Sequence, residues 1–486
     1  GHQFSTTPDA APASAGDALS GWAFDHWSEQ PTSSFSYSPT YPGLANPATI
    51  TMPASDKTIY ATFLQNGTTC HPTATQESQL MSIARNTWNG WTAADSNQKA
   101  EMLDKAEMAW DDTKANFWYW DGQMGDKWYA DFDRTTALTY EGLGDSMAWT
   151  GMSLAMLALK HSLMPTDTET LSDMDTVLTG IERNTQITGG GWVARFSGPT
   201  SDSLYYNYYN AYGPGAHTGV APWTTYTWLG GPTRDTHTGL FTGLAAMLQY
   251  CQDTTLLNRT KAVVERVVDQ LENDLWLISD GQGGIPEIGT PIMQQLWKRC
   301  AYKANPTKYS SYLSSITSYS LAYDQKGLYD SDYWVAWMGW ARAWAITLLE
   351  TDPTRKLSYQ NVIKGEYDST YLHMNLLYTS VACFHDPGTM NPWGVATIEG
   401  GLICEPDGIR WRRYVDNHSD PAFTYQDATH TVEAALPHQR THHDFDGQRS
   451  AAETDGGWND LAYANQNLQV PFYYWMGRVG GYISAP

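Results

Sequence analysis

Cysteine is scarce in this chain of 486 residues, and its spacing excludes two kinds of metal centre. There are five cysteines, and they form no CxxC or CxxCH motif. Structural zinc and covalently attached haem need such closely spaced ligands, so neither is expected. Cys251 and Cys383 lie in apolar stretches, which favours buried thiols at both positions. If the protein is exported, a disulfide between Cys383 and Cys404, or between Cys70 and another cysteine, stays open as an alternative.

Basic residues are also few. The chain has 29 lysines and arginines against 52 aspartates and glutamates, which gives a formal net charge of -23. Proteins that bind nucleic acid neutralise its phosphates with basic side chains, so nucleic acid is not an expected partner. The acidic balance also weighs modestly against a strongly anionic substrate, unless a local basic groove overrides it.

Several familiar sequence signals are missing as well. No apolar stretch is long and uninterrupted enough to predict a membrane span. The phosphate-binding P-loop, a GxGxxG turn after a strand, GxSxG and HExxH are all absent. Nucleotide, dinucleotide, serine-esterase and zinc-protease functions therefore have no support in the sequence.

Aromatic residues, in contrast, are abundant, with 22 tryptophans and 30 tyrosines. Flat rings with a polar edge suit the apolar faces of sugars, although most rings in any chain of this size fill the core. The candidates for stacking on sugar rings lie in the helix starts and in the aromatic segment 203–231. These candidates are Trp149, Tyr205, Tyr208, Trp228 and Trp334.

Beyond residue 70, apolar and amphipathic segments alternate at helical spacing. Segments that are apolar on nearly every face predict buried inner helices, and the amphipathic ones predict outer helices that cover them. This alternation is typical of an (α/α) toroid, so the sequence predicts a mainly α fold of that kind over residues 70–486. The expected helices span residues 75–89, 97–112, 146–162, 169–185, 236–252, 255–276, 289–304, 307–321, 333–350, 353–364 and 369–384.

The apolar segments share polar starts that contain an aspartate. Asp145, Asp235, Asp332 and Asp368 each stand at or just before the first turn of an expected inner helix. Such residues cap helices, because their oxygens accept the unpaired amides of the first turn. A ring of helices brings such starts together, so the sequence predicts one site lined by helix N-termini.

Residues 1–66 differ from the rest and predict a small β domain, rich in serine, threonine and proline with short strand-like runs. The stretches 21–28 and 44–58, and the sequence ITMPASDKTIYATF at 50–63, resemble the bacterial InlB-type B-repeat. The resemblance implies a bacterial protein that is extracellular or on the cell surface.

Residues 110–482 resemble a group of secreted bacterial six-hairpin proteins. The stretches that carry the resemblance are 144–151, 187–195, 234–239 and 474–478. The architecture is similar to that of many glycoside hydrolases and polysaccharide lyases. By analogy with that architecture, the expected function is action on an extracellular polysaccharide or glycan, and the oligomeric state stays open.

Two chemistries fit the polar starts. Asp145, Asp235 and Asp332 are candidates for the acid and the base of glycoside hydrolysis, which needs one protonated and one ionised carboxyl. Arg234 and His237 are candidates for orienting the substrate or moving a proton, since a lyase needs a base and a cation beside the uronate. The alternative is a non-catalytic surface or matrix protein that keeps an enzyme-like toroid.

No cofactor is expected. The run Asp444-Phe445-Asp446-Gly447 is weakly similar to a Ca²⁺-binding loop, but it lacks the third acidic position and the distal glutamate of an EF-hand. The sequence predicts no metal ligands elsewhere.

Overall fold

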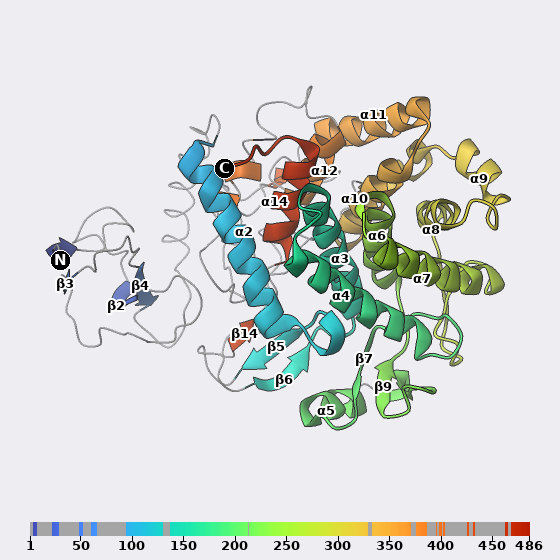
Figure 1. Ribbon diagram of the computed structural model, residues 1–486, viewed down its shortest axis with the longest axis horizontal. Helices are drawn as coiled ribbons and strands as arrows, with labels where there is room; N and C mark the ends of the chain where they lie inside the picture. The colour runs from blue at the N-terminus through green and yellow to red at the C-terminus, as the bar shows by residue number, and fades with distance from the viewer. Residues whose placement is uncertain are drawn as a thin grey trace.

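The computed structural model describes most of the chain between residues 94 and 486, together with short strands near the N-terminus (Figure 1). The described ranges are 94–129, 137–211, 213–328, 333–370, 376–385, 395, 398–400, 402–403, 462–464 and 468–486, with strands at 3–6, 22–28, 48–51, 60–65, 425–426 and 431–432. This part of the chain is mainly helical, which confirms the predicted class.

Twelve helices and three 3-10 turns lie within the described residues. The helices are α2 (Ser96–Phe117), α3 (Ser146–Leu163), α4 (Thr168–Gln186), α5 (Ser203–Ala211), α6 (Arg234–Tyr250), α7 (Thr254–Asn273), α8 (Pro291–Ala304), α9 (Tyr312–Ser318), α10 (Tyr333–Leu349), α11 (Pro353–Thr370), α12 (Leu376–His385) and α14 (Gln469–Gly480). The turns are η1 (Trp120–Gly122), η2 (Gly213–Gly215) and η3 (Leu321–Leu328).

The predicted helix order between residues 146 and 384 is confirmed, but some boundaries differ. Helix α7 ends at Asn273 rather than 276, because Leu275 and Trp276 adopt left-handed φ angles of 55° and 66° that no α-helix accommodates. Helix α9 is shorter than predicted and α11 is longer. The helix predicted at 75–89 lies outside the described residues.

Apolar helices lie inside and amphipathic helices cover them. In α3 nearly every residue is buried, and it contacts α4, α6 and α14. Contacts continue from α6 to α10, from α10 to α12, from α12 to α14 and back to α3. Helix α7 instead buries one stripe, which contains Val263, Val264, Val267 and Val268, and exposes its charged face.

Helices α3 and α6 approach each other unusually closely, because glycines face each other at their crossing. A Cβ atom added to Gly151 would overlap the backbone of Gly239, and one added to Gly239 would overlap the carbonyl of Ala148. A Cβ atom on Gly243 would likewise overlap the carbonyl of Gly151. The missing side chains let the two backbones touch, and the starts of the two helices come together as a result.

Two small sheets lead into these helix starts. Strands β5 (Asp126–Tyr129), β6 (Ala137–Glu141) and β14 (Ala462–Ala464) form one antiparallel sheet in the order β14-β5-β6. Strands β7 (Phe196–Pro199), β8 (Ala216–Thr218) and β9 (Tyr226–Leu229) form the other in the order β7-β9-β8. Strand β6 precedes α3 and β9 precedes α6, and Figure 1 shows these strands along the same edge of the helical body.

The aromatic segment 203–231 is more ordered than the predicted loop. It contains α5, β8 and β9, and β9 pairs with both β7 and β8. The buried ring of Tyr205 packs against Trp120 and Phe196, and its hydroxyl donates to the carbonyl of Thr227. These long-range contacts fold the segment onto the helical body.

Two antiparallel strand pairs lie within the segment predicted as a β module, and the module itself stays a prediction. Strand β1 (Gln3–Thr6) pairs with β3 (Ala48–Thr51), and β2 (Trp22–Ser28) pairs with β4 (Tyr60–Gln65), both antiparallel. A further pair, β12 (Tyr425–Gln426) with β13 (Thr431–Val432), lies near the C-terminus. The predicted boundary between 1–66 and 70–486 falls outside the described residues and stays a prediction.

Two further expectations are met in the described residues. Cys251 and Cys383 are buried thiols, as is Cys300. Among the helices of the described part, none combines the length and the apolar character needed to cross a membrane.

A short hairpin of β10 (Leu277–Ile278) and β11 (Glu287–Ile288) follows α7.

Helix α7 begins with a side-chain cap that can be tested. The carboxylate of Asp253 accepts the amides of Thr255 and Leu256, both at 2.9 Å. Replacing Asp253 with alanine is expected to lower the free energy of unfolding by about 1 kcal/mol. Urea denaturation measures it, and Asp253→Asn, which keeps an accepting oxygen, is the control. An equal loss in both variants would contradict the capping role.

Candidate functional site

Asp145 stands at the N-terminal end of α3, where the chain leaves strand β6. A tight turn closes this connection, in which Gly142 has a φ of 64° and its carbonyl accepts the amide of Asp145 at 3.0 Å. The Asp145 carboxyl forms no capping bond to α3, although the sequence favours one. Instead it lies where the charge of Asp235 acts on it and raises its pKa. The predicted meeting of helix starts is therefore present at α3 and α6.

Asp235 lies in the first turn of α6, where its surroundings favour negative charge. Its carboxylate accepts the hydroxyl of Thr233 and, at 2.9 Å, the amide of Thr236. The N-terminal end of a helix also stabilises an anion through its unpaired amides. The Asp235 carboxylate is therefore held against the N-terminal end of α6.

Burial raises the pKa of Asp145 from its ordinary value of 3.8 to about 7, and the negative charge of Asp235 adds to the effect. Arg195 acts in the opposite direction, and the buried Asp126 raises the pKa slightly further. The Asp145 side chain keeps 35% of its surface exposed, so a proton held there remains accessible to solvent. A carboxyl protonated near neutral pH beside an ionised one is the arrangement used in general acid catalysis.

Arg195 connects the two segments that carry the pair. Its Nε donates to the carbonyl of Gly231 at 2.6 Å, and its Nη1 donates to the carbonyl of Gly144 at 3.0 Å. The same Nη1 lies 3.8 Å from Oδ1 of Asp145. Arg195 is not among the residues predicted for the site, although it is the last residue of the stretch 187–195 that carries the family resemblance.

Arg342 is a second arginine that sequence reasoning misses, and it lies on the Asp235 side of the pair. It is 5% exposed, and its Nε donates to the hydroxyl of Thr238 in α6 at 2.7 Å. Burial is the main cause that lowers the pKa of Arg342 to about 9. The charge of Arg234 contributes to this lowering, and the charge of Asp235 opposes it. The sequence feature that could have identified Arg342 is that it is the one charged residue in the apolar stretch 335–349.

Arg234 and His237 lie at the start of α6 but do not take part in the pair. Arg234 is half exposed, and its Nε lies 3.4 Å from Oε2 of Glu287 on β11. His237 is buried beside the rings of Phe241 and Trp297, and burial alone lowers its pKa to about 3. A neutral imidazole among apolar rings is poorly placed to exchange protons with a substrate, so the role predicted for His237 gains no support from its position.

Three of the five predicted sugar-stacking rings are in the interior. Tyr205 and Trp228 pack within the β7–β9 region, and Trp149 stacks on Trp337 with ring centres 5.5 Å apart. A ring buried on both faces leaves no face for a sugar. Tyr208 on α5 is partly exposed. The predictions for Asp332 and for the Trp334 side chain fall outside the described residues.

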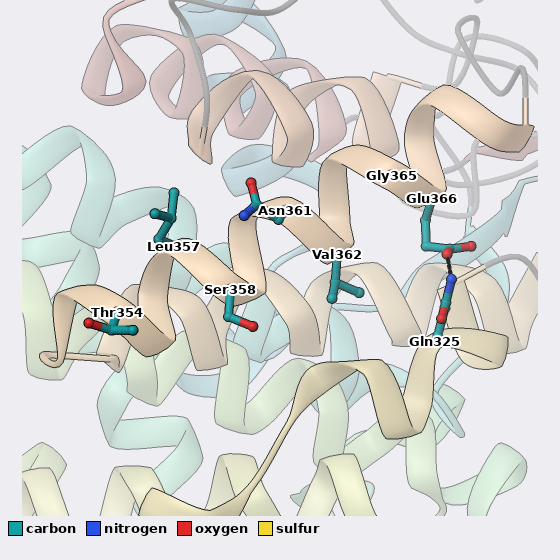
Figure 2. A pocket seen from close by; sticks show the side chains of 8 residues that line it. All are labelled: Gln325, Thr354, Leu357, Ser358, Asn361, Val362, Gly365 and Glu366. Atoms are coloured by element: carbon teal, nitrogen blue, oxygen red, sulfur yellow. Dashed lines mark hydrogen bonds between the residues drawn. The ribbon is translucent and has the colours of Figure 1, made fainter.

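An open groove of about 470 Å³ runs along α11 and η3 (Figure 2). Its one acidic residue is Glu366, whose carboxylate accepts the side-chain amide of Gln325. None of the predicted site residues lines it. A single engaged carboxyl offers no acid and base pair, so the groove is not the candidate site.

Metal ligation finds no support in the part of the chain that the structure describes, where no group of three or more His, Cys, Asp and Glu side chains converges. The weak Ca²⁺-loop similarity at 444–447 lies outside that part. Comparison with protein-family models, curated proteins and solved structures gives no match to this chain. The chemistry of the site therefore rests on its own residues.

The raised pKa of Asp145 predicts how stability depends on pH. Between about pH 4 and pH 7 the folded chain holds a proton that the unfolded chain releases, so the free energy of unfolding falls as pH rises through this window. Each unit of difference between the folded and the unfolded pKa corresponds to about 1.4 kcal/mol of unfolding free energy. Because solvent screens this partly exposed carboxyl, we expect the free energy of unfolding to fall by about 1–2 kcal/mol in all. Urea denaturation at pH 4 and pH 8 measures the fall.

Asp145→Asn is the matched variant for this measurement, because it keeps the shape of the side chain and removes its titration. The variant is expected to lose about 1–2 kcal/mol less between the two pH values than the unsubstituted chain. An unchanged pH dependence would show that Asp145 titrates normally in the folded protein.

Proposed function

We propose that the Asp145–Asp235 pair is the acid centre of an extracellular or cell-surface carbohydrate-active enzyme. The observation that carries the proposal is the close approach of the starts of α3 and α6, where the charge of Asp235 adds to burial in raising the pKa of Asp145. Asp145 donates its proton to the oxygen that leaves when a glycosidic bond breaks. The resulting carboxylate lies beside Asp235, and this repulsion favours the return of a proton from solvent.

The closeness of the pair bears on the type of cleavage. The two catalytic carboxyls of glycoside hydrolases are about 5–5.5 Å apart in retaining enzymes and about 6.5–9.5 Å apart in inverting ones. In the proposal Asp145 and Asp235 form one acid centre, in which the charge of Asp235 raises the pKa of Asp145, and the base or nucleophile comes from elsewhere. In the proposed hydrolase Asp332, just before α10, supplies it. In a polysaccharide lyase Arg234 or another cation neutralises the uronate instead.

The same proposal includes the architecture and the N-terminal module. The circuit of helix contacts from α3 through α6, α10, α12 and α14 back to α3 supports an (α/α)6 toroid of the six-hairpin type. The InlB-like residues 1–66 support attachment to a bacterial surface. A polysaccharide or another glycan is the proposed partner, with no cofactor.

One observation favours a second function. Trp149, Tyr205 and Trp228 fill the interior near the helix starts and leave no stacking surface. A toroid filled in this way fits a non-catalytic surface or matrix protein that binds glycans without cleaving them. The two functions differ in whether Asp145 has a substrate to protonate.

Incubation with neutral and uronate-containing polysaccharides, with products identified by mass spectrometry, tests the proposal. Fragments that have gained a water indicate a hydrolase, and unsaturated fragments indicate a lyase. Asp145→Asn, assayed in parallel, identifies any contaminating activity. An absence of fragments from every polymer would overturn the enzymatic proposal in favour of the non-catalytic one.

A further inference from the structure

Arg342 is a buried cation with mostly neutral neighbours. Its Nε donates to the Thr238 hydroxyl at 2.7 Å, and its Nη2 lies 3.5 Å from the carbonyl of Arg234 and 3.0 Å from the sulfur of Met338. Within the described residues, no carboxylate forms an ion pair with it. Three neutral contacts leave its positive charge without a partner, and its Nη1 donates to no described acceptor.

The charges around Arg342 increase the cost of burying it. Arg234, one turn before Thr238 on α6, acts on it as a like charge, while Asp235 and Asp324 attract it from beyond ion-pair distance. Arg234 and Asp324 are themselves engaged, with Glu287 and with the hydroxyl of Tyr319. A buried charge without a counter-ion is unfavourable, and a guanidinium keeps its charge at any physiological pH. A bound anion would supply the missing charge.

The position of Arg342 connects this need to the carboxyl pair. Its guanidinium lies against the first turn of α6, the turn that carries Asp235. Arg195 lies on the other side of the pair, 3.8 Å from Asp145. Two arginines and the N-terminal ends of two helices therefore lie near Asp145 and Asp235, and the charge of the buried Asp126 adds to the raised pKa of Asp145. This local balance contrasts with the net charge of -23 for the chain.

We infer that Arg342 determines specificity by binding the carboxylate of an acidic sugar, so that the substrate is a uronate-containing glycan. The planar fork of a guanidinium matches a carboxylate. A carboxylate also supplies the single negative charge that a single unpaired guanidinium needs. The inference rests on the proposed function and names its substrate class.

Equilibrium binding of glucuronic acid to the full chain tests the inference without requiring turnover. The matched neutral probe is methyl glucuronate, the ester with the same ring and no charge. Calorimetry at pH 7 is expected to give at least tenfold tighter binding of the acid than of the ester. Arg342→Gln is expected to abolish that difference, and Arg342→Lys to reduce it, because lysine keeps the charge but loses the fork.

Arg478→Gln is the control, because Arg478 contacts Tyr474 on α14 and leaves the site unchanged. Circular dichroism melting of each variant establishes that it is folded, and Arg342→Lys carries the test if Arg342→Gln does not fold. The inference would be overturned if the acid and the ester bound equally or if neither bound. It would also be overturned if the Arg342 variants kept the same preference for the acid. Cleavage of a neutral polymer together with equal binding would overturn the inference and leave the proposed function standing.

Discussion

Asparagine at position 145 is expected to lower turnover by about 10²–10⁴-fold, the usual contribution of a general acid. The Asp145 carboxyl carries the proton that cleavage needs, and an amide of the same shape cannot deliver it. Asp235→Asn is expected to abolish turnover, since it removes a negative charge that adds to burial in raising the pKa of Asp145. Both variants should stay folded. Initial rates on the polymer identified by the polysaccharide panel measure the effect.

Asp173→Asn is a matched control for both substitutions. Burial raises the pKa of Asp173 too, but its carboxylate accepts the indole N–H of Trp110 at 2.9 Å, on α4 and away from the pair. Its rate is expected to match that of the unsubstituted chain. Full activity in Asp145→Asn would remove the acid role, and full activity in Asp235→Asn would confine Asp235 to capping α6.

Alanine at Gly239 is expected to lower the free energy of unfolding by about 1–3 kcal/mol, the typical cost of overpacking a well-packed interior. Its Cβ would overlap the carbonyl oxygen of Ala148, which belongs to helix backbone and has little freedom to move. The two helices would have to separate, and the distance between Asp145 and Asp235 would grow with them. Urea denaturation and polysaccharide cleavage are measured on the same variant.

Gly365→Ala is the control for this experiment. Gly365 is exposed on α11, and a Cβ atom there meets no neighbour within 4 Å. Alanine favours helices over glycine by about 1 kcal/mol, so this variant should be slightly more stable. If Gly239→Ala were equally stabilising, close backbone packing would not be what joins α3 to α6.

The helices could be predicted from the sequence because their apolar spacing is a local property. That spacing locates α3 and α4 nearly to the residue, and it identifies α6 and α10 as buried because apolar residues cover all their faces. The close contact of Asp145 with Asp235 could not be derived in the same way. It depends on which glycines face each other across α3 and α6, and spacing within one helix contains no information about its neighbour.

The aromatic predictions show the same limit. Tyrosines and tryptophans in the segment 203–231 are compatible with either a sugar platform or a packed core. Pairing of β9 with β7 and β8 directs Trp228 inward, and packing of α5 against Trp120 and Phe196 buries Tyr205. Arg342 could not be selected from the sequence for a related reason. A lone arginine in an apolar helix becomes a candidate only when the structure shows that it contacts Thr238 and the carbonyl of Arg234 rather than a carboxylate.

Helix α14 has a consequence for the order in which the protein is made. It covers α3 with Phe472, Tyr473 and Trp475 among its buried residues, and Lys160 of α3 lies over the ring of Trp475. About 300 residues separate the end of α3 from the start of α14. At about 5–20 residues per second, a ribosome takes roughly 15–60 s to synthesise them. During that interval α3 displays an apolar face with no cover, so the nascent chain is expected to depend on chaperones until residues 469–480 emerge.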